Sequence, residues 1–279
     1  DLHKALDVPV GLIHASVRGT AIEMWMPHEA LNGNRAATPI FDNHERELER
    51  WRIERYPDPD KHAAEYWNRM TAYFADYMDR WRKLRKEGVQ HPRQAMPEDV
   101  VDQFDDHKHL EILFKKSMPS AFYNAMIAPL SPYRLRGVIW YQGESNARRP
   151  KGYATLLKAL ITSWRDLWGQ DNFAFHVVGI ANIHEPPETP TDSGWARIRD
   201  AQFRVTRKTK NAGFANTIDL GEADTAHPKN KQEVGARLVR VALAETYRRP
   251  DIIASGPVFD GLTKTDKGTI VHFSDTAGK

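Results

Sequence analysis

The hydrophobic residues of this chain gather in four short runs that are rich in Val, Ile and aromatic side chains, which favours β-strands. The second and third runs are almost continuously apolar, as expected for strands that are buried on both faces. The sequence therefore predicts four strands, within Val8–Ala15, Leu135–Tyr141, Phe173–Ile180 and Ala212–Leu220.

An amphipathic helix is predicted between the second and third strands. Apolar residues recur there at spacings of three and four from Tyr153 to Trp168, and the pattern stops at Gly169. Strand and helix in alternation indicate an α/β fold, with a parallel sheet covered by helices on both faces. Such sheets carry their functional residues at the carboxyl ends of the strands. The polar segments at these ends are Ser16–Thr20, Gln142–Asn146, Ala181–His184 and Gly221–His227.

Residues 28–115 interrupt this alternation with helical patterns in a charge-rich setting. We expect a helical insertion that packs on the parent domain, which spans residues 1–255. The alternative is a coiled coil that binds a partner, but the apolar stripe lacks three clean heptads. The tail, Gly256–Lys279, has strand character and is too short to form its own core, so it is interpreted as the start of a truncated β segment.

Composition excludes several classes of protein. The 279 residues are 41% hydrophobic and 28% charged, which is typical of a globular chain. The net charge is only +3, with basic residues dispersed among acidic ones, so nucleic acid is not an expected partner. No apolar run approaches the ~20 residues that span a bilayer, so no membrane association is expected. Without cysteine there are no disulfides or thiolate ligands, and the compartment stays open.

One candidate for catalysis is the pair Asp224 and His227, three residues apart just ahead of Pro228. Proline is tolerated in the first turn of a helix, so Pro228 is expected to open one. A turn can bring the carboxylate to the imidazole Nδ1, which leaves Nε2 free to take a proton from a nucleophile. The alternative is a capped helix with a surface histidine and a solvated aspartate.

A second candidate follows the predicted strand in "GVIWYQGESNA", Gly137–Ala147. An amide directly after a buried strand, followed by a glycine that permits close approach, suits Gln142 to donate to an oxyanion. Ser145 is a candidate nucleophile, but Ser145 or Asn146 also suits a helix cap.

Two further kinds of site are minor alternatives. "DDHKH", residues 105–109, and "IHEPPE", residues 183–188, contain metal ligands without the spacing of a helical zinc site. Glu23 and Glu144 are the candidate acid and base of a glycosidase.

Three blocks, "VPVGLIHASVRGTAIEMW", "PSAFYNAMIAPLSPYRLRGVIWYQGESNA" and "TIDLGEADTAHPKNKQEVGARL", together resemble the sialate O-acetylesterase family of SGNH-type hydrolases. The likeness runs from Asp1 to about Ser255. It implies a flavodoxin-like three-layer sandwich that removes acetyl groups from sugar hydroxyls through an acyl-serine, without a cofactor. It also suggests a periplasmic or secreted location.

The resemblance assigns roles residue by residue. His227 corresponds to the catalytic base and Asp224 to its orienting carboxylate. Gln142 corresponds to the side-chain oxyanion donor and Gly19 to the backbone donor, while Gly143 and Glu144 belong to the same substrate-binding block. In this family Ser145 accompanies that block and is not the attacking residue.

The chain also departs from the family pattern. The family nucleophile lies in a Gly-Gln-Ser-Asn-Met stretch upstream of the first block, and this sequence has no such stretch. Val17-Arg18-Gly19-Thr20 stands where the family usually has Trp-Gly-Gly-Thr, so Arg18 crowds the oxyanion hole if the replaced glycine was the donor.

The resemblance therefore implies a carbohydrate O-acetylesterase whose first strand and nucleophile are not in this chain. A missing N-terminal segment or another chain would complete the sheet. The competing hypothesis is a non-catalytic carbohydrate-binding or scaffold protein that keeps the fold without the chemistry.

Overall fold

The computed structural model describes residues 1–55, 118–170 and 172–274, together with some positions between 61 and 87. The chain divides into two units. The first comprises Asp1–Pro39 and Pro119–Lys279, and the second comprises Ile40–Met118. The first unit contains the sheet and every residue that was identified from the sequence as a candidate for catalysis.

The elements of the first half of the chain are mostly short. They are α1 (Leu2–Leu6), η1 (Ile22–Trp25), α2 (His28–Leu31), α3 (Thr38–Arg55), η2 (Tyr123–Ile127) and η3 (Ala128–Leu130). The sheet and its covering helices follow. They are β1 (Gly137–Trp140), η4 (Glu144–Asn146), α7 (Tyr153–Trp168), β2 (Ala174–Val178), α8 (Gly194–Lys208), β3 (Ala212–Ala215), η5 (Ile218–Leu220), α9 (Lys231–Val241), η6 (Ala242–Thr246), β4 (Val258–Thr265) and β5 (Gly268–Ser274).

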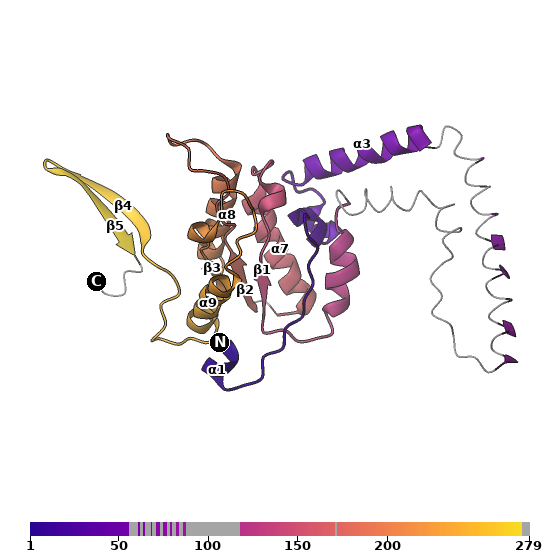
Figure 1. The fold of residues 1–279 in the computed structure, drawn as a ribbon, viewed down its shortest axis with the longest axis horizontal. Helices are drawn as coiled ribbons and strands as arrows, with labels where there is room; N and C mark the ends of the chain where they lie inside the picture. Colours follow the sequence, from indigo (N-terminus) through magenta and orange to yellow (C-terminus); the bar gives the residue numbers. More distant parts are fainter. Residues whose placement is uncertain are drawn as a thin grey trace. The chain divides into compact units, whose positions relative to one another are not determined.

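Strands β1, β2 and β3 form a parallel sheet in that order, which confirms three of the four predicted strands (Figure 1). Side chains alternate along β2. The Phe175 ring faces Trp164 of α7, and the His176 ring faces Thr246 of η6. Helices α7 and α8 therefore cover one face of the sheet and α9 with η6 covers the other, so the predicted α/β class with helices on both faces is confirmed.

The fourth predicted strand, Val8–Ala15, was wrong. This segment has no regular structure, and Leu12 and Ile13 are 83% and 54% exposed. A strand needs a neighbour for its backbone hydrogen bonds, and no described strand pairs with the outer edge of β1. The lack of a described neighbour also leaves β1 partly exposed, although it was predicted to be buried on both faces. Its residue Ile139 is 55% exposed.

Helix α7 has the bounds that its apolar pattern predicted. Its residues at three and four spacing are buried against the sheet and η1, and Gly169 ends it in a left-handed conformation with φ of 59°. Each fully buried leucine of this stripe stabilises the fold by about 1.5–3 kcal/mol relative to an exposed one. The buried residues are Tyr153, Leu156, Leu157, Leu160, Ile161, Trp164 and Arg165.

An aromatic cluster joins the N-terminal segment to the sheet. The ring of Trp140 lies edge-on to those of Trp25 and Trp164, with centroids 6.4 and 5.9 Å apart. The indole of Trp164 donates to the Trp25 carbonyl oxygen at 2.9 Å. This packing holds η1 against β1 and α7, and so brings the preceding turn to the end of β1.

The second unit is described in part. Its described positions from 61 to 86 are helical, but most of the apolar residues that predicted an insertion, such as Trp67 and Trp81, lie outside the described residues. The boundaries 28–115 and 1–255 stay predictions. None of the helices in the described part of the chain is both long and apolar enough to cross a lipid bilayer.

The tail forms an antiparallel hairpin of β4 and β5, with a bulge between Phe259 and Gly261. The register pairs Phe259 with Phe273 and Leu262 with Val271. Because alternate residues share a face, these four side chains lie on one face, and each is at least 46% exposed.

Leu157→Ala tests the core. Leu157 is fully buried, so the free energy of unfolding should fall by about 2–5 kcal/mol. Leu12→Ala is the matched control, because removing an exposed side chain should change stability by no more than ~0.5 kcal/mol. Urea unfolding followed by circular dichroism measures both. Equal losses would mean that Leu12 belongs to the core after all.

His176 should make stability depend on pH. Burial lowers the pKa of this histidine from 6.5 to about 4, because the imidazolium form loses its hydration. Between these values only the unfolded chain binds the proton, so stability falls as pH falls, by about 3 kcal/mol in total. Urea unfolding at pH 7 and pH 4.5 should show a smaller difference for His176→Gln than for the wild type. His272→Gln, in the exposed hairpin, should keep the wild-type difference.

Candidate functional site

The loop after β1 is packed too tightly for bulky side chains. A Cβ atom on Gly143 would lie 2.8 Å from the Cγ2 atoms of Ile180 and Ile198, and one on Gly194 would collide with the carbonyl oxygen of Ala147. Glycine at these two positions lets the loop lie against the N-terminal half of α8. The residues of the "QGESN" motif are thereby fixed at the carboxyl end of β1.

The side chain of Gln142 is fully engaged. Its Nε2 donates to the carbonyl oxygen of Thr20 at 3.1 Å and to Oδ1 of Asn146 at 2.7 Å. Its Oε1 accepts from the hydroxyl of Tyr153 at 3.0 Å. Both amide protons are therefore committed, and Gln142 must exchange one of these bonds before it can donate to a substrate oxygen.

Asn146 connects this loop to η1. Its Oδ1 also accepts from the backbone N–H of Ile22 at 3.0 Å, and its Nδ2 donates to Oε2 of Glu23 at 3.0 Å. Glu23 is only 1% exposed and is paired with Arg149 at 3.4 Å. The carboxylate of Glu23 is thus held within the protein, which disfavours the glycosidase interpretation that needs it at a sugar.

Gly19 lies in the turn that precedes η1. Its φ of 74° is left-handed, where a Cβ atom is strained. The turn is closed by Oγ1 of Thr20, which donates to the Val17 carbonyl oxygen at 2.9 Å and accepts from the indole of Trp25. The Thr20–Gln142 bond then places Gly19 next to the end of β1. Arg18 is exposed in the same turn.

The loop that carries Asp224 and His227 is stabilised differently from the prediction. Glu222 accepts from Lys229 through both its backbone N–H and its Nζ, and the backbone N–H of His227 donates to Oγ1 of Thr225. No hydrogen bond or ion pair joins the exposed Asp224 to His227 among the described contacts, so the predicted contact is not formed.

Helix α9 also begins later than predicted. It starts at Lys231, and the side chain of Asn230 caps it by accepting from the backbone N–H of Glu233 at 3.1 Å. Pro228 is buried in the preceding loop. The helix therefore begins after Asn230 and not at Pro228, because the asparagine oxygen accepts a hydrogen bond from a free N–H group of the first turn.

His227 interacts electrostatically with Glu144. Burial raises the pKa of the Glu144 carboxyl, and this rise is opposed by hydrogen bonds from backbone N–H groups and by the charges of His227 and Lys231. Burial and then the charge of Glu144 raise the pKa of Tyr141 to about 12, and Nζ of Lys231 lies 5.0 Å from the Tyr141 ring centroid. The loops after β1 and β3 therefore meet at one edge of the sheet.

Ser145 is exposed in η4, next to Glu144. No hydrogen bond links its hydroxyl to His227 in the described contacts. Most of the nominated residues, Gly19, Gln142, Gly143, Glu144 and His227, are thus brought to the carboxyl edge. The serine that would complete a triad is not among the groups in contact with His227.

Sequence reasoning missed the amide that joins the strand ends. Gln202 of α8 is fully buried, its Nε2 donates to the Gln142 carbonyl oxygen at 2.8 Å, and its Oε1 accepts from the Ile180 N–H at 3.1 Å. The signal was a polar residue on the apolar side of a helix, beside Ile198, Ala201 and Val205.

Metal ligation finds no support in the described part of the chain. No group of three or more His, Cys, Asp or Glu residues there is arranged to hold an ion. His184 and Glu185 are exposed, and residues 105–109 lie outside the described residues.

Comparison with known proteins gives consistent results. Residues 109–244 match the family described as carbohydrate esterase, sialic acid-specific acetylesterase. A sialate O-acetylesterase of Rattus norvegicus is 27% identical over 272 residues, covering 92% of this chain and 43% of that protein. The sialate O-acetylesterase of Homo sapiens is 33% identical over 159 residues, covering 51% of this chain and 30% of that protein.

A solved structure shows the same fold. The crystal structure of a novel carbohydrate acetylesterase from Xanthomonas citri superimposes with a TM-score of 0.52 and 33% identity, covering 56% of this chain and 36% of that one. The chain thus spans less than half the length of each of these relatives. The family match through residues 109–244, the curated relatives and the solved structure thus all relate this chain to the sialic acid-specific acetylesterases among the carbohydrate esterases.

Proposed function

We propose that the protein is a carbohydrate O-acetylesterase, which hydrolyses acetyl esters of sugar hydroxyls on sialic acid or another acetylated glycan. The observation that carries the proposal is that the loops after β1 and β3, which carry Gln142 and His227, meet at the carboxyl edge of a parallel sheet, where Nζ of Lys231 lies 5.0 Å from the Tyr141 ring centroid. The match of residues 109–244 to a family of carbohydrate esterases supports the reaction type. The relatives are named for the same reaction.

The proposed reaction runs through an acyl-serine. His227 takes the proton of a serine hydroxyl as the serine oxygen attacks the acetyl carbon. Donors from Gln142 Nε2 and the Gly19 N–H stabilise the oxyanion. His227 then protonates the departing sugar oxygen, and a water molecule that His227 activates releases acetate. Asp224 orients the imidazole once the loop brings it to Nδ1.

The serine is proposed to come from polypeptide outside residues 1–279, in the same protein or another chain. The support is the unoccupied outer edge of β1 in the described structure, with Ile139 exposed beside it. A strand laid along this edge would end next to Gly19, Gln142 and His227, because parallel strands end at the same edge.

A non-catalytic sugar-binding protein is the second candidate. The observation that favours it is the engagement of both amide protons of Gln142, which leaves no free side-chain donor for an oxyanion. The two functions differ in turnover, so an activity measurement separates them.

Activity on p-nitrophenyl acetate tests the source of the nucleophile. Residues 1–279 alone should show negligible hydrolysis, because no serine in the described part of the chain is hydrogen-bonded to His227, and restoring the upstream segment should restore activity. In the restored protein His227→Ala should abolish activity, whereas Ser145→Ala should not. A fully active 1–279 fragment that Ser145→Ala inactivates would make Ser145 the nucleophile. An inactive restored protein that still binds sugar would favour the non-catalytic candidate.

The orienting carboxylate is tested by Asp224→Asn and Glu144→Gln in the active form. If Asp224 orients His227, Asp224→Asn should lower kcat by about 10²–10⁴-fold with little change in KM. Glu144→Gln should have the smaller effect. The reverse order would assign the role to Glu144, whose charge interacts with that of His227 in this structure.

A further inference from the structure

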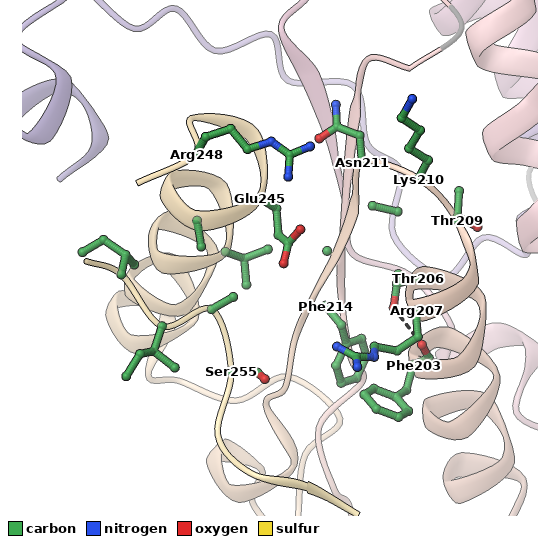
Figure 2. Close-up of a pocket in the computed structure, with 17 residues that line it drawn as sticks. Phe203, Thr206, Arg207, Thr209, Lys210, Asn211, Phe214, Glu245, Arg248 and Ser255 are labelled. Atoms are coloured by element: carbon green, nitrogen blue, oxygen red, sulfur yellow. Dashed lines mark hydrogen bonds between the residues drawn. The ribbon is translucent and has the colours of Figure 1, made fainter. Parts of the chain in front are cut away.

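A cavity of about 520 Å³ lies beside the outer edge of β3 (Figure 2). Residues of α8 form one wall, η6 with residues 252–255 forms the other, and the start of β3 lies between them. The volume is in the range of sites for small organic ligands. The cavity runs along β3 from Asn211 to Phe214, and no residue of the loop that follows β3, which carries His227, lines it.

The charged residues of the lining are mostly cationic. Arg207, Lys210 and Arg248 contribute three positive charges, against the single carboxylate of Glu245. Lys210 and Arg248 form no ion pair in the part of the chain that the structure describes, whereas the neighbouring Arg249 is paired with Asp251 at 3.1 Å. An anionic group in the cavity would therefore be attracted without displacing an existing salt bridge.

The cavity also contains an unsatisfied acceptor. Oδ1 of Asn211 is buried and has no hydrogen-bond partner, while Nδ2 of the same amide donates to the Asn172 carbonyl oxygen at 2.5 Å. A buried carbonyl oxygen without a donor costs about 1–3 kcal/mol. A ligand with an O–H or N–H group would remove that cost, and a simple anion would not.

Two aromatic rings line the part of the cavity that lies lowest in Figure 2. The rings of Phe203 and Phe214 are arranged edge to face with centroids 5.5 Å apart, and the buried Val241 also lines the cavity. Figure 2 shows both rings at the opposite end of the cavity from Arg248 and Asn211. Figure 2 also shows Arg207 beside the two rings, so a ligand would meet charge and an acceptor at one end and an apolar surface flanked by a guanidinium at the other.

The turn that carries Lys210 and Asn211 is held rigidly. The buried guanidinium of Arg165 donates to the carbonyl oxygens of Lys210 and Asn211, at 2.9 and 3.2 Å, and also to that of Phe173. Oγ1 of Thr209 donates to the Val205 carbonyl oxygen at 2.7 Å. The backbone of this turn is therefore fixed before a ligand arrives, which reduces the entropy lost on binding.

We propose that this cavity is a second, non-catalytic site that binds an acidic sugar, that is, a polyhydroxylated carboxylate of monosaccharide size. Its carboxylate is bound by Arg248 and Lys210, a hydroxyl or amide N–H donates to Asn211 Oδ1, and its apolar C–H surface lies toward Phe203 and Phe214. The inference does not depend on the esterase reaction, because none of the residues placed at the carboxyl edge lines this cavity.

Isothermal titration with free N-acetylneuraminic acid tests the site. We expect saturable binding, with much weaker binding of acetate, which lacks the hydroxyl groups, and of N-acetylglucosamine, which lacks the carboxylate. Arg248→Gln and Lys210→Gln should each weaken binding about tenfold or more, as expected for the loss of one charge-assisted hydrogen bond. Arg249→Gln is the matched control, because it removes a neighbouring charge outside the cavity, and its affinity should be unchanged.

The variant His227→Ala distinguishes binding in this cavity from binding at the carboxyl edge. If the acidic sugar binds beside β3, this variant keeps the wild-type affinity even where hydrolysis is lost. Affinity that falls in His227→Ala and persists in Arg248→Gln and Lys210→Gln places the sugar at the carboxyl edge and overturns the proposal. Equal binding of acetate and the acidic sugar, or no binding of either, also overturns it. Circular dichroism of each variant shows whether a loss of binding reflects unfolding.

Discussion

Burial of three side-chain amides is the constraint on which the carboxyl edge of the sheet depends. Gln142, Asn146 and Gln202 are each at most 9% exposed, and a buried amide is costly unless its donors and acceptors are paired. Their partners are backbone groups of segments far apart in the chain, including Thr20, Ile22 and Ile180. The amides thus fix the relative position of the turn before η1 and the ends of β1 and β2.

This network also explains how the site is assembled from the aromatic cluster outward. Trp25 and Trp164 bring η1 against α7, and the amide of Asn146 then determines where η1 lies along β1. Apolar packing supplies most of the stabilisation, while hydrogen bonds select one register. Loss of a single amide would leave several buried groups unpaired at once, because each of them has more than one partner.

Local patterns predicted much of the fold. The apolar stripe of α7 and its end at Gly169 could be predicted because both depend only on residues within the helix and its cap. The apolar run of β2 could be predicted because this strand is buried on both faces. Val8–Ala15 has a similar composition, but no described strand lies beside it to accept its backbone hydrogen bonds. The hydrophobic pattern of a segment does not show whether a neighbouring strand is present. The start of α9 was predicted too early because Pro228 and Asn230, two residues apart, both suit the beginning of a helix.

The candidate site was predictable as a set of segments but not as a set of contacts. Strand ends indicated that Gln142 and His227 would meet at one edge. Spacing could not show that Glu144 interacts electrostatically with His227, since this depends on how two loops fold toward each other. Gln202 was missed because one polar residue in an apolar helical stripe has no distinct motif.

The close approach of Gly143 and Gly194 to their neighbours has a consequence for how the protein can diversify. Neither position accepts even a methyl group, so the inner wall of the carboxyl edge is closed to change by single substitution. Residues 184–192, between β2 and α8, are exposed and leave from the same edge. Divergence in substrate preference can accumulate in this loop while the inner wall stays invariant, so the loop is the evolvable part of the site.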